Sequence, residues 1–130
     1  MADYFFDTSV LVAYLKEEDV HTVQLVDAAL SGNSTATISA ITVAEVYAAG
    51  DMGDAALREK RLAMLKLLDV VAVDREIAER GGELRRQHNL ALPDALIAAC
   101  AEQSGGRFLS KDPHFNRLLN TGVLVGEVYS

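Results

Sequence analysis

Short runs rich in aromatic and β-branched residues alternate along this chain with longer stretches of helical periodicity. Runs of this kind, bounded by turn residues, are typical of buried strands. They lie at residues 4–6, 35–39, 70–73, 107–110 and 123–125. Strands separated by helices need crossover connections, which make neighbouring strands parallel. The pattern therefore predicts an α/β fold, a three-layer α/β/α sandwich in which helices cover both faces of a central, mainly parallel sheet.

The stretches between these runs predict the helices. They lie at residues 10–15, 20–30, 41–49, 55–68, 75–88 and 93–104, and a shorter helix begins at Pro113. The helix at 41–49 is apolar almost all round, which is typical of a buried helix. The glycine pair at 81–82 weakens the helix at 75–88, because glycine in a helix interior costs about 0.5–1 kcal/mol relative to alanine.

Length and composition limit the class of protein. A length of 130 residues fits one domain that spans residues 1–130. Hydrophobic residues make up 50% of the chain and charged residues 24%, which excludes a disordered chain and a collagen-like fibre. The formal net charge of −7 excludes a histone-like DNA wrapper, although an acidic protein can carry a local basic face.

Cysteine usage and the N-terminal residues bear on the compartment. Cys100 is the single cysteine, so an internal disulfide is excluded and a structural zinc site lacks its ligands. The first residues have neither the basic nor the apolar region of a signal peptide. No uninterrupted apolar run is long enough to cross a bilayer. We therefore expect a soluble, cytoplasmic protein without a membrane partner.

Three aspartates are placed where α/β proteins build their sites, outside the carboxyl ends of the strands. Asp7 ends the first strand, Asp112 follows the run at 107–110, and Asp94 lies in the first turn of a helix. Each aspartate would also stabilise a helix N-terminus, either as a cap or through the helix dipole. Capping and chemistry are therefore both open interpretations of these residues.

Glu45 lies among apolar residues in the helix at 41–49. An ionised carboxylate inside such a helix is costly unless it is paired. A buried arginine, a proton or a bound cation would each explain it. We favour the cation, because no arginine is close in sequence.

Gathering four carboxylates at one end of a sheet requires a counter-charge, because like charges raise one another's pKa values. Oxygen ligands without His or Cys select Mg²⁺ or Mn²⁺. One or two such ions would suit the set, and paired ions are a common arrangement for phosphodiester hydrolysis. The set expected to act as metal ligands and catalytic residues is Asp7, Glu45, Asp94 and Asp112.

Four segments together carry a family resemblance. They are FFDTSVL at 5–11, TVAEV at 42–46, LPDALIAA at 92–99 and LSKDPHF at 109–115. In these segments, in their order and spacing, and in its length, the chain resembles the PIN domain, especially the small VapC-type toxins of toxin–antitoxin pairs. The resemblance covers essentially the whole chain.

The resemblance implies a Mg²⁺- or Mn²⁺-dependent endoribonuclease with the four acids named above as its site. It implies that Ser110 supports the site, and Thr8 is a further candidate for that role. Asn116 lies where some members of the family carry another acid, so either Asp112 or the position of Asn116 is the fourth site member. The resemblance also implies a homodimer and a cognate antitoxin. A toxin and a housekeeping RNA-processing nuclease are both compatible with it.

Candidate substrate contacts are basic. Lys111 lies next to the acid cluster in sequence, and Arg85 and Arg86 belong to a basic region in the middle of the chain. They could contact RNA phosphates. The alternative for the arginines is that they belong to solvated helix faces and pair with neighbouring glutamates.

Two other functions fit parts of the pattern. A phosphoacceptor domain of the receiver type is also a parallel α/β unit, and Asp74 and Lys111 would be its aspartate and lysine. Alternatively, the protein is a non-catalytic PIN-like binding module whose acid cluster holds a structural ion or a basic peptide.

Overall fold

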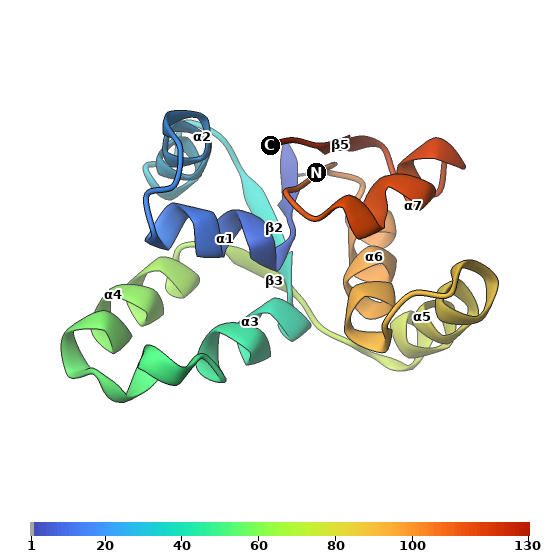
Figure 1. Ribbon diagram of the computed structural model, residues 1–130, viewed down its shortest axis with the longest axis horizontal. Coiled ribbons are helices and arrows are strands. Elements are labelled where there is room, and N and C mark those ends of the chain that lie inside the picture. Colours follow the sequence, from blue (N-terminus) through green and yellow to red (C-terminus); the bar gives the residue numbers. More distant parts are fainter. Residues whose placement is uncertain (1) are drawn as a thin grey trace.

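The computed structural model describes residues 2–130, which form a five-stranded sheet whose strands all run parallel (Figure 1). The strands are β1 (Tyr4–Phe6), β2 (Ala36–Ser39), β3 (Asp69–Val71), β4 (Arg107–Ser110) and β5 (Gly126–Val128). Their order is β3-β2-β1-β4-β5. The chain therefore builds the sheet to one side of β1 first and then crosses to the other side. The switch lies between β1 and β4, and a crevice outside the carboxyl ends of those two strands is the expected ligand site.

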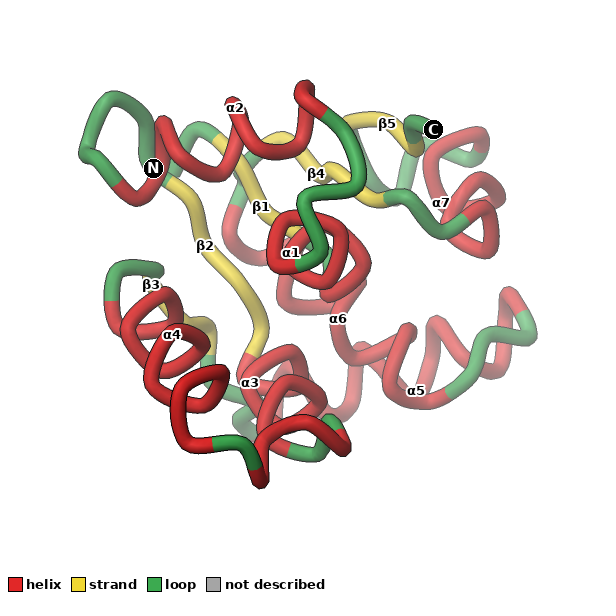
Figure 2. Tube along the Cα trace, turned by 60° about the vertical axis from the view of Figure 1, so that its left-hand side comes forward, coloured by secondary structure: helices red, strands yellow, loops and turns green. Residues whose placement is uncertain are grey.

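Helices cover both faces of this sheet. They are α1 (Thr8–Leu15), α2 (Val20–Leu30), α3 (Ala40–Tyr47), α4 (Ala55–Lys66), α5 (Arg75–His88), α6 (Leu92–Ser104) and α7 (Asn116–Asn120), with 3₁₀ turns at Gly50–Gly53 and Pro113–Phe115. In Figure 2, α1 lies in front of the sheet and α6 behind it. The predicted three-layer α/β/α fold with a parallel sheet is confirmed.

Adjacent residues of β1 divide the hydrophobic core into two parts, because successive side chains of a strand point to opposite faces. Phe5 is fully buried together with Phe108 and the apolar residues of α5, α6 and α7. Phe6 is fully buried on the other face, together with Leu109 and residues of α1, α2 and α4. The continuous apolar runs of β1 and β4 thus follow from burial on both sides.

The last strand was predicted at 123–125, and this prediction is wrong, because β5 begins at Gly126. Leu124 is instead buried, and its N–H donates to the carbonyl of Leu118 at 3.1 Å. Gly126 has a φ of 156°, and a Cβ built there would lie 1.8 Å from the carbonyl oxygen of Phe108. Pairing with β4 therefore starts at the residue that lacks a Cβ.

The third strand is shifted from the prediction as well. It was expected at 70–73 and spans Asp69–Val71. It forms an edge of the sheet, and Val70 is 47% exposed. The run 70–73 is apolar, but its last two residues already lead towards α5.

The expectation that the helix at 41–49 is buried all round is also wrong. In α3, Thr42 and Val46 are buried, whereas Ala44, Glu45 and Tyr47 are exposed. The sequence of this helix is mostly apolar because it contains several small residues, yet one face of the helix is exposed to solvent. Burial therefore gives no reason for a counter-charge at Glu45, and any role for this residue depends on its neighbours.

Candidate active site

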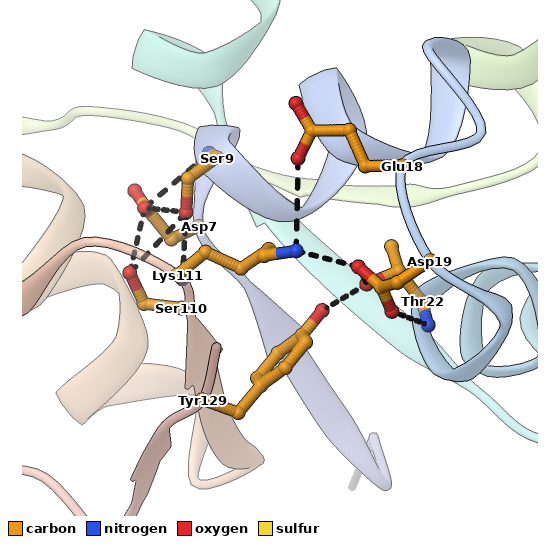
Figure 3. A network of polar contacts seen from close by, with 8 residues as sticks. All are labelled: Asp7, Ser9, Glu18, Asp19, Thr22, Ser110, Lys111 and Tyr129. Atoms are coloured by element: carbon orange, nitrogen blue, oxygen red, sulfur yellow. Dashed lines mark hydrogen bonds and ion pairs between the residues drawn. The ribbon is translucent and has the colours of Figure 1, made fainter.

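Asp7 is the N-cap of α1 at the carboxyl end of β1. Its Oδ2 accepts hydrogen bonds from Ser9 Oγ at 2.6 Å, Ser110 Oγ at 2.9 Å and the Ser9 N–H at 3.3 Å (Figure 3). The residue is 4% exposed. Burial raises the pKa of Asp7 above its usual value, and the hydrogen bonds from the two serines and the backbone oppose this only in part. A nearby cation would favour the ionised form.

Two serine hydroxyls join the end of β1 to the end of β4. Ser110 is fully buried, and its Oγ also accepts the N–H of Asp112 at 2.9 Å. Ser9 Oγ accepts the N–H of Lys111 at 2.9 Å. The predicted supporting residue Ser110 therefore touches Asp7 directly. Ser9 makes an equivalent contact through its own hydroxyl.

Thr8 connects α1 to α3. Its Oγ1 donates to Glu45 Oε1 at 2.7 Å and lies 2.8 Å from Thr42 Oγ1. Because the single hydroxyl hydrogen of Thr8 is used on Glu45, Thr42 is the donor in the second bond. Thr8, a predicted supporting residue, thereby orients the otherwise exposed Glu45.

Asp94 shows that the four acids share one region. It lies half-buried in the first turn of α6, after Pro93. Burial raises the pKa of Asp94 most strongly, and the charges of three other acids raise it further, while His114 lowers it. Those three acids are Asp112, Asp7 and Glu45. Four carboxylates from four separate segments of the chain therefore lie near one another at the carboxyl edge of the sheet, and Asp94 is affected by the charges of the other three.

Asp112 caps the 3₁₀ turn Pro113–Phe115. Its Oδ1 accepts the N–H of His114 at 2.9 Å and the His114 Nδ1–H at 2.7 Å. The capping interpretation is thus correct for both Asp7 and Asp112, and it coexists with their place in the acid cluster. Asn116, the other candidate for the fourth site member, is exposed at the start of α7.

The chemistry of these donors fits a hard divalent cation. All are carboxylate oxygens. Burial raises the pKa of Asp94 most, and a cation would offset the further rise that the charges of the other three acids cause. Within residues 2–130, no three acidic, histidine or cysteine side chains already stand at the distances of a formed metal site. An ion would have to draw the carboxylates together. All three hydrogen bonds that donors of Ser9 and Ser110 make to Asp7 reach Oδ2, so Oδ1 receives none of them and is the oxygen left for an ion to bind.

The predicted substrate contacts are placed differently. The Lys111 side chain leads away from Asp7 towards Asp19, whose Oδ2 lies 2.5 Å from its Nζ (Figure 3). Arg85 Nη1 donates to the carbonyl of Leu90 at 2.7 Å, and Arg86 is exposed. Elsewhere on α5, Arg75 pairs with Glu79, and Arg80 pairs with Glu83 and with Glu102 of α6.

A doubly wound parallel sheet with an acid cluster at its switch point defines an α/β protein with an acidic site outside strands β1 and β4. The family model of the PIN domain matches residues 4–119. The chain therefore belongs to the PIN domain family, and the receiver-like alternative is dismissed.

Solved structures agree with this family. A toxin–antitoxin complex from Klebsiella pneumoniae is similar at 25% identity, with 94% of this chain and 95% of that chain covered and a TM-score of 0.72. VapBC2 from Rickettsia felis, bound to a promoter DNA fragment, is similar at 19% identity, with 98% of each chain covered and a TM-score of 0.74. DNA-bound VapBC from Salmonella typhimurium is similar at 21% identity, with 100% of each chain covered and a TM-score of 0.74. The likeness to VapC-type proteins is thus confirmed at the level of the fold.

Curated protein sequences contain no significant match to this chain. Among the helices formed by residues 2–130, none has the length and apolar character needed to span a membrane.

Proposed function

We propose that this protein is a Mg²⁺- or Mn²⁺-dependent endoribonuclease and the toxin of a toxin–antitoxin pair. The observation that carries the nuclease proposal is the gathering of four carboxylates at the switch point of the sheet. Asp94 lies close enough to Asp7, Glu45 and Asp112 for their charges to add to the rise in its pKa that burial causes. A divalent cation bound among these carboxylates would neutralise their negative charge. Family membership and the likeness to toxin–antitoxin structures support the toxin role.

In this proposal the four carboxylates hold the ion or ions. A bound divalent ion supplies an activated water and stabilises charge on the scissile phosphate. Ser9 and Ser110 fix Oδ2 of Asp7, which leaves Oδ1 to bind. Thr8 fixes Oε1 of Glu45, which leaves its second oxygen to bind or to orient the attacking water. No side chain acts as a covalent nucleophile.

The expected partners of this protein are inferred from the solved structures that resemble it. Structures similar to this chain are described as toxin–antitoxin complexes, so we expect a cognate antitoxin that inhibits the protein. We also expect a homodimer and a cytoplasmic location, where the RNA substrate is found. A short open reading frame beside the gene, encoding a small DNA-binding protein, would support the toxin role over a housekeeping role.

The test is cleavage of a generic single-stranded RNA with Mg²⁺, with Mn²⁺ and with EDTA. We expect cleavage with either ion and none with EDTA. Asp7→Asn should abolish cleavage with an intact fold, because asparagine caps a helix as well as aspartate does. Cleavage in EDTA or by Asp7→Asn would refute the proposal. An ion that raises the melting temperature without any cleavage would instead identify the binding module.

A further inference from the structure

Lys111 stands between two residues of the proposed site, Ser110 and Asp112. Its backbone N–H donates to Ser9 Oγ at 2.9 Å, and that hydroxyl donates to Asp7 Oδ2 at 2.6 Å. The Lys111 backbone therefore contacts the Ser9 hydroxyl that is bound to Asp7, and it directly follows Ser110, whose hydroxyl is the other side-chain donor to Asp7. Whatever fixes this short segment also fixes the geometry around Asp7.

The Lys111 side chain is anchored far from the site. Its Nζ lies 2.5 Å from Asp19 Oδ2, 3.6 Å from Glu18 Oε2 and 5.5 Å from the centre of the Tyr129 ring (Figure 3). The side chains of Lys111 and Asp19 are 17% and 27% exposed. A pair shielded to this degree is screened less than an exposed surface pair.

The anchor is itself held by further contacts. Asp19 is the N-cap of α2, and its Oδ1 accepts the N–H of Thr22 at 2.7 Å. Thr22 Oγ1 donates to Asp19 Oδ2 at 3.0 Å and accepts from the Tyr129 hydroxyl at 2.7 Å. The Tyr129 N–H donates to the Ser110 carbonyl at 2.9 Å. This ring of contacts returns to the residue next to Lys111.

We propose that the ion pair between Lys111 and Asp19 is a positioning clasp for the active site. It holds the segment 110–112 so that Ser9 and Ser110 aim the carboxylate of Asp7 and so that Asp112 is presented beside it. The clasp depends on the proposed function, since Asp7 and Asp112 are the metal-binding residues of that proposal. Lys111 is thus a positioning residue and not the phosphate contact expected from its sequence position.

The variants that test the clasp change the charge of Lys111 or Asp19 and leave the rest of the fold intact. Lys111→Met keeps the apolar stem and removes the charge, and Lys111→Arg keeps the charge. Asp19→Asn removes the charge of the partner and preserves the α2 cap, because asparagine is as good an N-cap as aspartate. The matched control is Lys16→Met. Lys16 is an exposed lysine in the connection between α1 and α2 that also contains Asp19.

The first measurement is Mn²⁺ affinity by calorimetric titration without RNA. Lys111→Met and Asp19→Asn should each lower it by about three- to tenfold, less than the about 10- to 100-fold expected for a group that touches a metal ligand. The double variant should be no worse than either single one. Lys111→Arg should restore most of the affinity, and Lys16→Met should change nothing. In RNA cleavage, kcat should fall while KM stays constant.

The second measurement is hydrogen exchange of the Lys111 amide in the metal-free protein, which should be faster in Asp19→Asn than in the wild type. Unchanged exchange and unchanged Mn²⁺ affinity in both charge variants would overturn the clasp. A rise in KM for Lys111→Met alone would also overturn it and identify a phosphate contact. A wild-type protein that binds no Mn²⁺ would refute the proposed function, while the exchange measurement would still report on the clasp.

Discussion

Ser110 Oγ at the end of β4 lies 2.9 Å from Asp7 Oδ2 at the end of β1, although the two residues are 103 positions apart. The parallel pairing of these strands, with Phe6 opposite Leu109, brings the next residue of each chain segment together. The contact is therefore a direct product of strand register. It places a donor on Asp7, the one carboxylate of the four that is buried.

Replacing Ser110 by alanine should weaken metal binding. The variant removes one donor from Asp7 and leaves the N–H of Asp112 without its acceptor, so the pKa of Asp7 should rise further. We expect Mn²⁺ affinity to fall by about 10- to 100-fold, as for other groups that orient a ligand. Unfolding by urea should show a loss of about 1–3 kcal/mol. Ser104→Ala, at the far end of α6, is the control, and equal loss of affinity in both variants would contradict the prediction.

The metal-free protein should lose stability as pH rises above the ordinary pKa of aspartate. The pKa values of Asp7 and Asp94 are raised in the fold, so the folded state binds more protons than the unfolded chain at mildly acidic pH. Their contribution to stability is complete below the unfolded pKa and is lost as pH rises through the raised values. Melting temperatures measured from pH 4 to pH 7 should show this decline, and it should be smaller in Asp94→Asn.

Mg²⁺ should reverse that decline at neutral pH, because an ion that binds only the folded state stabilises it by mass action. The rise in melting temperature should be absent in Asp7→Asn. An identical pH profile for wild type and Asp94→Asn would show that the raised pKa of Asp94 has no effect on stability.

Thr8→Val should release Glu45 with little change of shape, since valine and threonine have similar volumes. Glu45 then loses the hydroxyl that fixes Oε1, and we expect kcat for RNA cleavage to fall about tenfold. Adding Glu45→Gln should cost less in Thr8→Val than in the wild type, because the two residues act together. Thr35→Val, at the opposite end of the sheet, should keep full activity. Independent effects of the two site substitutions would disprove the coupling.

Much of the arrangement of the candidate site could be predicted, because it depends on where strands end. Asp7 and Asp112 follow the buried runs of β1 and β4, and parallel strands end at one edge of a sheet. Glu45 was predicted because we expected it to be buried, and this reason is wrong. The alanines of α3 are apolar residues, but Ala44 and Glu45 are exposed. The contact of Lys111 with Asp19 spans 92 positions and follows no periodicity, so no local pattern announces it.

In the fold, too, some features follow from a local sequence pattern and others depend on contacts with distant residues. Runs buried on both faces are recognisable by their adjacent apolar residues, Phe5 and Phe6 in β1 and Phe108 and Leu109 in β4. The start of β5 is not, since it is set by the close approach of Gly126 to the Phe108 carbonyl and not by the β-branched residues before it. Boundaries that depend on a neighbouring backbone are invisible in a single sequence.

The paired glycines of α5 give a last prediction, on stability. Gly82→Ala should stabilise the protein by about 0.5–1 kcal/mol, because nothing lies within 4 Å of a Cβ built there and alanine is the better helix former. A Cβ at Gly81 would lie 2.6 Å from a methyl group of Leu96 and 3.3 Å from its Cα, so Gly81→Ala must push α6 or its side chain aside. The two substitutions have the same intrinsic gain, and their difference in urea unfolding therefore measures the packing of α5 on α6. Equal stability of the two variants would mean that α6, which carries Asp94, shifts to accommodate the new methyl group without a loss in the free energy of unfolding.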